Sequence, residues 1–307
     1  MTINGEIDQA HLIDQIDESD DHVYLSLVED HGSDGDAHWA FGTGFEDPLF
    51  GVDTDIPAGI DGQALAACCL DLADDALVTA QRLAECCTLA PELEEELALA
   101  NIGLDLLGQA RLLYARTGQL DGSGRGEDAY AYFRDAFEFR NVRLAELPNG
   151  DFAFSIARLL VQSVWRLALF ERLTGSADPV LAAVAAKGVK ELTYHRQYAA
   201  EWTVRLGDGT EESAVRMQRG LDQVGPYLEE LFASSSGVED DAVDLRAEVI
   251  TVLQQVASAA ELHLPPIGTT PPPGLGRLGR SGQHTEHLAP LLAELQVVAR
   301  ADPEATW

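Results

Sequence analysis

The sequence is poor in positive charge. Its 307 residues carry 20 Lys and Arg against 52 Asp and Glu, a formal net charge of −32, and only Lys187 and Lys190 are lysines. A surface of this sign repels nucleic acid and anionic membranes, so neither is an expected partner. An acidic, lysine-poor surface is typical of a protein that stays soluble at very high salt, where screening removes the self-repulsion. We therefore expect a halophilic, cytoplasmic protein.

Signals for export, membrane insertion and disulfide bonding are also missing. No N-terminal stretch joins a basic flank to a short apolar core, and no uninterrupted apolar run is long enough to span a bilayer. The cysteines fall in two adjacent pairs, Cys68-Cys69 and Cys86-Cys87. On one helix these pairs would lie about 27 Å apart, too far for a shared metal ion or a disulfide. We expect them to be small buried residues in a reducing compartment.

Motifs of common enzyme classes are absent as well. The sequence has no phosphate-binding glycine loop, no G-x-S-x-G turn around a nucleophilic serine and no dinucleotide-binding fingerprint. Strand-like alternation of apolar and polar residues is nearly absent too. Neither an enzyme of those classes nor a β-rich fold is therefore expected.

Helical patterns fill the chain from Asp61 onward. Asp61 suits a helix cap, and Asp178 followed by Pro179 is typical of another helix start. The expected helices cover residues 62–87, 91–116, 129–147, 152–174, 179–206, 211–233 with a break at Gly225-Pro226, 241–262 and 283–300. Several are longer than the usual three turns, which favours a bundle. We predict an all-α, ferritin-like helical bundle over residues 61–307, after an acidic, partly irregular N-terminal extension of residues 1–60.

The stretch 91–116 carries the most informative pattern. Pro91 sits at a first-turn position, followed by four glutamates where the helix dipole favours anions. Apolar residues on more than one side predict a helix packed among other helices. One apolar stripe is Leu93, Leu97, Ala100, Leu104 and Leu107, and the other is Leu99, Ile102, Leu106 and Leu113.

Asn101 and Asp105 lie one turn apart inside this helix. A polar pair in a buried helix is either a structural hydrogen-bonded group or the remains of a site. Because an uncompensated buried aspartate is destabilising, we expect Asp105 to be hydrogen-bonded or ion-paired. The expected partners are Asn101, Lys187, Lys190 and His195.

Ferritin-like bundles often hold a di-iron centre in their core. Its ligands are a Glu from each of two helices and a Glu-x-x-His motif from each of the other two, a spacing that puts both side chains on one face. The corresponding residues of the 91–116 helix are Asp105 and Gly108, and glycine offers no ligand. In the later long helix, Glu191 and His195 are four residues apart instead of three. With at most two ligands where about six are needed, we predict a degenerate di-iron site and no metal or cofactor in this chain.

A second group of candidate residues lies near the C-terminus. His284, Glu286 and His287 stand at the start of the expected last helix, after a Gly/Arg-rich segment that contains Arg277 and Arg280. Glu286 and His287 are adjacent and face different ways, so no Glu-x-x-His motif is formed. We expect these residues to hold the loop or to contact a neighbouring chain rather than to bind a metal ion.

Four blocks of the sequence resemble, in the same order, the C subunits of phenylacetyl-CoA epoxidases (PaaC). The blocks are residues 90–111, 146–158, 190–195 and 282–296, and the resemblance covers roughly residues 62–307. It implies a ferritin-like subunit that has lost its own di-iron centre. It also implies a structural role, in which the chain holds a homologous catalytic subunit in its active shape.

The resemblance further implies partners and a reaction. The catalytic A subunit would carry the di-iron centre, and bridging and reductase subunits would complete the complex. The complex would insert one oxygen atom of O₂ across the aromatic ring of phenylacetyl-CoA, giving a ring 1,2-epoxide. Electrons would come from NADPH through a flavin and a [2Fe–2S] cluster of the reductase.

Two other functions stay open at this point. One is a di-iron oxygenase in its own right, which Gly108 argues against because a ligand is missing. The other is a helical scaffold outside any oxygenase, which the four ordered blocks argue against. The sequence does not decide whether the chain contacts the CoA ester.

Overall fold

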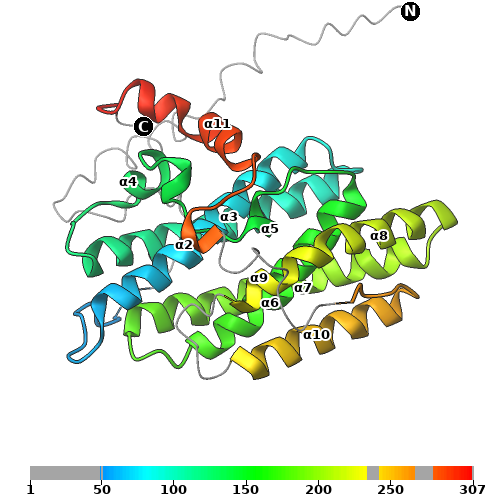
Figure 1. Cartoon of the computed structure of the whole chain (residues 1–307), viewed down its shortest axis with the longest axis horizontal. Helices are drawn as coiled ribbons and strands as arrows, with labels where there is room; N and C mark the ends of the chain where they lie inside the picture. Colours follow the sequence, from blue (N-terminus) through cyan, green and yellow to red (C-terminus); the bar gives the residue numbers. More distant parts are fainter. Residues whose placement is uncertain (1–48, 50, 234–241, 267–278, 306–307) are drawn as a thin grey trace, which may run out of the picture. The chain divides into compact units, whose positions relative to one another are not determined.

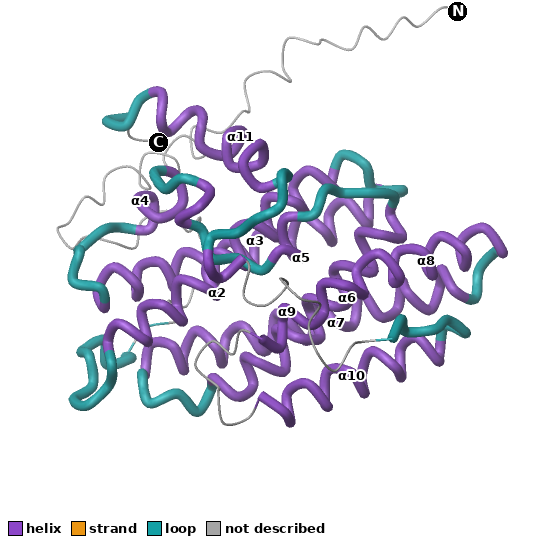
Figure 2. Tube along the Cα trace, in the orientation of Figure 1, coloured by secondary structure: helices purple, strands orange, loops and turns teal. Residues whose placement is uncertain are grey.

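The structure, a computed structural model, describes residues 49, 51–233, 242–266 and 279–305. Pro48–Trp307 forms one compact unit. Among the described residues every regular element is a helix and no strand occurs (Figure 1; Figure 2). The all-α prediction is confirmed, and the predicted extension of residues 1–60 lies mostly outside the described ranges.

Four long helices form the core. α2 (Gly62–Cys87) and α3 (Leu93–Leu120) make one antiparallel hairpin, and α6 (Phe152–Leu173) and α7 (Pro179–Gly207) make the other. Their facing sides carry long rows of buried apolar residues, which join in one hydrophobic core. Gly188 allows α7 to approach α6 closely, because a Cβ at this position would lie 2.6 Å from the ring of Phe170.

Aspartates set the starts of three of these helices. Asp61, Asp151 and Asp178 each accept a hydrogen bond from a first-turn N–H, a donor that the helix itself leaves unsatisfied. The predicted starts at Asp61 and Asp178 are confirmed.

The predicted helix over residues 129–147 is wrong. The chain forms three short elements there: α4 (Glu127–Tyr132), the 3₁₀ turn η2 (Ala136–Glu138) and α5 (Arg143–Glu146). Between them, Arg140 N donates to Asp74 Oδ2 at 2.8 Å and Val142 N donates to Asp75 Oδ1 at 2.8 Å. Backbone N–H groups that a helix would use internally therefore satisfy carboxylates of α2.

The last helix starts later than predicted. α11 (Leu288–Ala301) begins five residues after Gln283, and a 3₁₀ turn, η5 (Gly279–Ser281), precedes it. We call residues 279–287 the C-terminal strap. Within it, Thr285 N donates to Glu146 Oε1 at 2.8 Å, so the strap is held to α5 by a bond that takes the place of a helical one.

α8 and α10, the longer of the remaining helices in this part of the chain, contact α6 and α7. The expected helix over 211–233 is broken, as predicted, into three elements: α8 (Glu211–Val224), η3 (Gly225–Tyr227) and α9 (Leu228–Ala233). Pro226 explains the break, because it has no N–H and its ring obstructs a continuous helix. α10 (Ala242–Ala259) packs against α6 and α7.

α6 is the one described helix that is long and apolar enough to cross a membrane by length and composition. In its most apolar window, however, 94% of the residues are buried inside the protein. This burial is typical of the central helix of a bundle.

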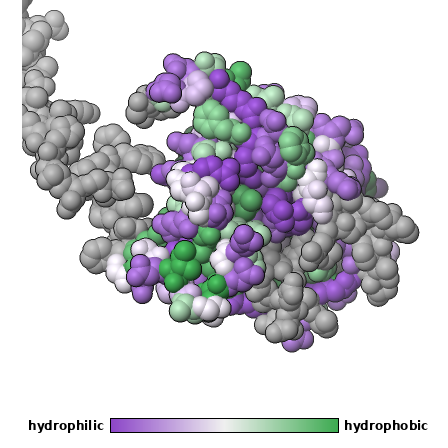
Figure 3. Space-filling model, turned by 60° about the vertical axis from the view of Figure 1, so that its left-hand side comes forward, coloured by the Kyte–Doolittle hydropathy of each residue, from purple (hydrophilic) through white to green (hydrophobic). Residues whose placement is uncertain are grey.

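α3 turns only one of its two apolar stripes inward. Leu99 is 1% exposed, whereas Leu93, Leu97 and Leu104 are 64%, 56% and 63% exposed. The prediction that both stripes are packed is therefore wrong for the first stripe. Figure 3 shows hydrophilic side chains over much of the face that it presents, with hydrophobic side chains gathered in smaller groups.

Candidate functional site

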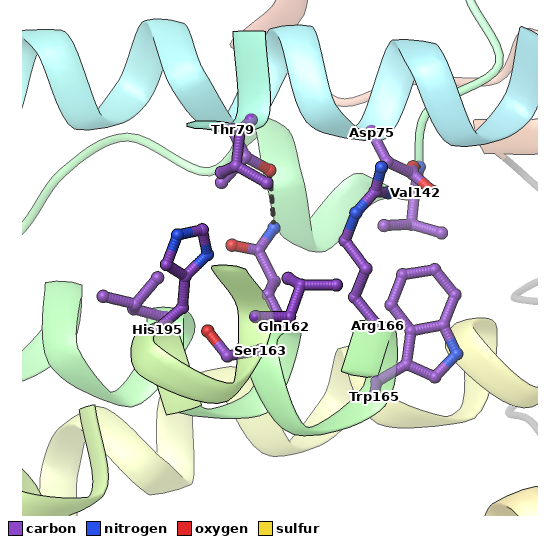
Figure 4. A pocket seen from close by; sticks show the side chains of 11 residues that line it. Asp75, Thr79, Val142, Gln162, Ser163, Trp165, Arg166 and His195 are labelled. Atoms are coloured by element: carbon purple, nitrogen blue, oxygen red, sulfur yellow. Dashed lines mark hydrogen bonds between the residues drawn. The ribbon is translucent and has the colours of Figure 1, made fainter. Parts of the chain in front are cut away.

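A small cavity lies between the four long helices (Figure 4). Its volume is about 20 Å³, which is enough for about one water molecule. Every long helix contributes to its wall, with Thr79 from α2, Leu106 from α3, Gln162 from α6 and His195 from α7. In a ferritin-like bundle, a metal centre would lie between the same four helices.

Gln162 and His195 face each other in this cavity, as Figure 4 shows. The Gln162 amide nitrogen donates to Thr79 Oγ1 at 3.1 Å. Gln162 Oε1 and His195 Nδ1 are both buried and have no hydrogen-bond partner among the described residues. Since unpaired buried polar atoms are rare, these two atoms mark a polar site that a packed apolar core would not contain.

His195 is bound through its other ring nitrogen. His195 Nε2 lies 3.0 Å from Asp105 Oδ2, and the two side chains are 1% and 36% exposed. His195 is one of the partners predicted for Asp105, and that pairing is confirmed. The expected burial is only partial, because Asp105 reaches the edge of the bundle and Asn101 is exposed.

The Glu191 side chain bonds to residues outside the cavity. It forms an ion pair with Lys187, one turn earlier, and accepts a hydrogen bond from Gln109 Nε2 at 2.9 Å. Glu191 does not line the cavity, whereas Leu192 does. Leu192 and His195 are three residues apart, the spacing of a Glu-x-x-His motif. A leucine therefore stands where that motif would have its carboxylate.

Gly108 leaves the corresponding position of α3 without a side chain. A Cβ at Gly108 would meet no atom within 4 Å, so packing does not require glycine there. Asp105 and Gly108 are also three residues apart, and they keep the acid of the motif but not its imidazole.

Arg166 brings a positive charge to the same cavity. Its buried guanidinium donates to Gln109 Oε1 at 3.0 Å and to the carbonyl of Leu72 at 3.1 Å. Burial lowers the pKa of Arg166 to about 10, so the side chain is still cationic at neutral pH. A fixed cation in the wall of the cavity opposes the binding of a metal cation.

Together these residues do not fit a di-iron centre. Of the roughly six ligand positions of such a centre, Asp105 and His195 keep ligand-type side chains, and these two are bonded to each other. Gly108 has no side chain, and Thr79, Gln162 and Leu192 in the cavity wall carry neither carboxylate nor imidazole. Asp75 also lines the cavity, but its carboxylate is ion-paired with Arg280. Nowhere in the described ranges do three or more His, Cys, Asp or Glu side chains gather so that they could share a metal ion.

Two residues in the wall of the cavity, Arg166 and Thr79, were not predicted from the sequence patterns. Arg166 interrupts an otherwise apolar stretch of α6, and that interruption was a usable signal. Thr79 carried no signal, because it falls in the apolar row of α2 and is recognised only by its bond to Gln162.

His284 fastens the C-terminal strap to the body. His284 Nε2 donates to the carbonyl of Phe139 at 2.8 Å, and His284 Nδ1 lies 3.2 Å from Glu146 Oε2. Burial lowers the pKa of His284, but the hydrogen bond and the charge of Glu146 outweigh this effect and raise the pKa above its ordinary value.

The other predicted strap residues differ in their surroundings. Arg280 is buried and forms an ion pair with Asp75 at 2.6 Å. The side chains of Glu286 and His287 are 89% and 39% exposed, and His287 occupies the cap position of α11. Arg277 lies outside the described residues. The contacts of Arg280 are therefore internal, whereas Glu286 and His287 are open to a partner.

Comparison with known proteins places this bundle in a family. Residues 53–307 match the family PaaA_PaaC, described as phenylacetic acid catabolic protein. The chain belongs to this family. The C subunit of the 1,2-phenylacetyl-CoA epoxidase of Escherichia coli (strain K12) is 42% identical to it over an alignment of 251 residues that covers 79% of the chain and 99% of the relative. The predicted resemblance and the ferritin-like helical fold are thereby confirmed.

Proposed function

We propose that this member of the PaaA_PaaC family is a non-catalytic, structural subunit of a phenylacetyl-CoA 1,2-epoxidase in aerobic phenylacetate degradation. It pairs with the di-iron catalytic A subunit and stabilises that subunit in its active shape. Similarity to the C subunit of an epoxidase supports membership of such a complex. The two long hairpins support a partner of the same architecture, since related bundles can bury a large apolar interface.

The observation that carries the proposal is the set of side-chain hydrogen bonds between the four long helices at and around the central cavity. In place of metal–ligand bonds, side-chain hydrogen bonds join the four long helices: Gln162 to Thr79, Gln109 to Glu191, Arg166 to Gln109, and His195 with Asp105. These bonds link α2 with α6, α3 with α6 and α3 with α7, while Gln162 Oε1 and His195 Nδ1 have no partner among the described residues. The bundle can therefore keep its shape without iron.

The cofactors of the reaction then belong to other subunits. The di-iron centre resides in the catalytic subunit, while the flavin, the [2Fe–2S] cluster and the NADPH site reside in the reductase, which a bridging subunit accompanies. The strongly acidic composition disfavours nucleic acid and anionic membranes. We place the complex in the cytoplasm.

Metal analysis of the chain purified alone and with the catalytic subunit tests this proposal. We expect almost no iron in the chain alone, and about two irons per catalytic subunit in the complex. Epoxidation of phenylacetyl-CoA is expected only when both subunits are present together with the reductase.

Two results would replace the proposal with its alternatives. About two irons per isolated chain, with oxygen consumption in the absence of the catalytic subunit, would indicate a di-iron oxygenase in its own right. Failure to bind the catalytic subunit at any salt concentration would indicate a helical scaffold outside the oxygenase.

We also infer a halophilic cell interior from the net charge of −32. Repulsion among the carboxylates destabilises the folded state, and salt screens it. The melting temperature is expected to rise from low to multimolar salt. A melting temperature that does not depend on salt would contradict this inference.

A further inference from the structure

Two buried polar atoms face the cavity between the four long helices. Gln162 Oε1 and His195 Nδ1 have no hydrogen-bond partner among the described residues, and their side chains are 8% and 1% exposed (Figure 4). The cavity that they line has a volume of about 20 Å³. A buried water molecule needs about 10–15 Å³ and two to four polar partners. The cavity therefore has the size of a site for one small polar ligand.

Both of these atoms are hydrogen-bond acceptors. The amide nitrogen of Gln162 already donates to Thr79 Oγ1 at 3.1 Å, which leaves the carbonyl oxygen Oε1 for the cavity. His195 Nε2 lies 3.0 Å from Asp105 Oδ2, and an ionised carboxylate can only accept, so Nε2 carries the proton. The buried guanidinium of Arg166 in the same wall disfavours a second positive charge, so His195 Nδ1 is the acceptor of a neutral ring.

The need for two donors selects among small ligands. An anion has no hydrogen atom to donate to Gln162 Oε1 or His195 Nδ1, and the lone pairs of both atoms repel it. Two unpaired donors of the wall, Arg166 Nη2 and Trp165 Nε1, would suit an anion, but in the view of Figure 4 Gln162 stands between His195 and these two side chains. A metal cation is opposed by Arg166. Water carries no charge and donates two hydrogen bonds.

We propose that the cavity binds one water molecule, which donates to Gln162 Oε1 and to His195 Nδ1. This water occupies the central position that a metal centre has in related bundles. Hydrogen bonds then run from Thr79 through Gln162, the water and His195 to Asp105, and so pass through all four long helices. Among the described side chains of the cavity wall, none of α6 bonds directly to one of α7, so the water supplies that connection.

The water also fixes the His195 ring. A hydrogen bond to Nδ1 holds the tautomer that has its proton on Nε2, and this tautomer is the one that donates to Asp105. The water and the ring therefore stabilise each other's orientation. This site does not depend on which partner the chain binds.

Crystals of the full chain, grown once in chloride and once in bromide at a resolution that orders internal water, test the ligand. We expect one peak at about 2.5–3.2 Å from both Gln162 Oε1 and His195 Nδ1, without anomalous signal in either crystal. Anomalous bromide density would identify an anion and overturn the proposal. A direct bond between Gln162 and His195, with no density between them, would overturn it as well. Anomalous iron density would contradict both this proposal and the proposed function, whereas the other two results would leave that function standing.

The tautomer of His195 is an independent readout. In the ¹⁵N-labelled chain at about pH 8, we expect Nδ1 to show the chemical shift of an unprotonated ring nitrogen and Nε2 that of a protonated one. Loss of these signals in His195→Gln assigns them. A proton on Nδ1 would overturn the proposal, because the ring would then donate to the cavity instead of accepting.

A variant removes one partner of the water. Gln162→Met keeps a long side chain but has no carbonyl oxygen, and we expect the water peak to be lost. Gln255→Met is the matched control, because Gln255 is exposed on α10, and it should keep the peak. Melting temperatures show whether both variants fold. A water peak that persists unchanged in Gln162→Met would overturn the assignment, and if that variant does not fold, the crystals and the tautomer of the unmodified chain decide.

Discussion

α2 and α3 are neighbours in one hairpin, but they carry contrasting rows of side chains. On its side toward residues 134–140 and the C-terminal strap, α2 carries Asp71, Asp74 and Asp75, all buried and each paired with an arginine of those segments. Asp75 also reaches the cavity between the four long helices. The outer side of α3 carries leucines and is exposed. A row of carboxylates can be buried only under a segment that itself carries cations, because a buried charge must be paired. An apolar row needs no specific partner group and is left for another molecule to cover.

The largest expected effect comes from removing a cation that covers α2. Arg280→Met leaves Asp75 buried without its ion pair, and we expect the free energy of unfolding to fall by about 3–5 kcal/mol. Urea unfolding at constant salt measures this loss. Arg219→Met is the control, because Arg219 and Asp151 form a pair whose side chains are 58% and 27% exposed.

For that control we expect a loss of at most about 1 kcal/mol, since exposed ion pairs contribute little. Equal losses for Arg280→Met and Arg219→Met would mean that burial does not distinguish the two pairs. The contrast between the carboxylate row of α2 and the leucine row of α3 would then lose its electrostatic basis.

The second comparison is between the two stripes of α3 itself. Leu99→Ala removes a side chain that is 1% exposed, and we expect a loss of about 2–5 kcal/mol from the lost burial and the cavity. Leu97→Ala changes a side chain that is 56% exposed, and in the isolated chain we expect a change of at most about 0.5 kcal/mol.

Both substitutions introduce alanine on the same helix, so helix propensity cancels between them. Chemical unfolding of the isolated chain is the measurement. A large loss for Leu97→Ala in the isolated chain would show that the exposed stripe is already covered before any partner binds.

The smallest expected effect is the pH dependence of the C-terminal strap. The folded-state pKa of His284 is raised above its unfolded value, chiefly by Glu146, against the opposing effect of burial. The stabilisation is therefore fully present below the unfolded pKa, near the ordinary value of 6.5, and is lost as the pH rises through the higher folded-state pKa. Asp74 adds a further favourable charge.

Unfolding measured across this pH range, with His284→Gln as the comparison, tests the assignment. The unmodified chain should exceed the variant in stability by a larger margin at pH 6 than at pH 9. A margin that does not change with pH would show that the proton on His284 does not hold the strap.

Helix ends were predictable where local chemistry decides them. Asp61, Asp178 with Pro179, and the break at Pro226 act through bonds and dihedral angles within a few residues, and each is found where it was expected. The segment after α4 was not predictable in this way. Its apolar spacing suits a helix, but Arg140 and Val142 bond through their backbone to carboxylates more than 60 positions earlier in the chain.

The candidate site was predictable in part for the same reason. The missing ligand at Gly108 could be inferred from spacing along one helix. The pairing of Asp105 could be inferred from the cost of burying an unpaired carboxylate, but its partner His195 lies on another helix. The choice of Leu192 over Glu191 as the residue facing the cavity depends on the rotation of α7 against three other helices. No local pattern specifies that rotation.

The sequence by itself determined that Leu93, Leu97 and Leu104 share one side of a helix, because the helical repeat is a property of the backbone. It also determined that Gly108 cannot supply a ligand. Only the tertiary structure decided that the described chain leaves those leucines exposed while it encloses Leu99, and that Thr79, Gln162 and His195 meet in one layer. Both outcomes depend on which segments pack against each face, and that is set by contacts between residues far apart in the chain.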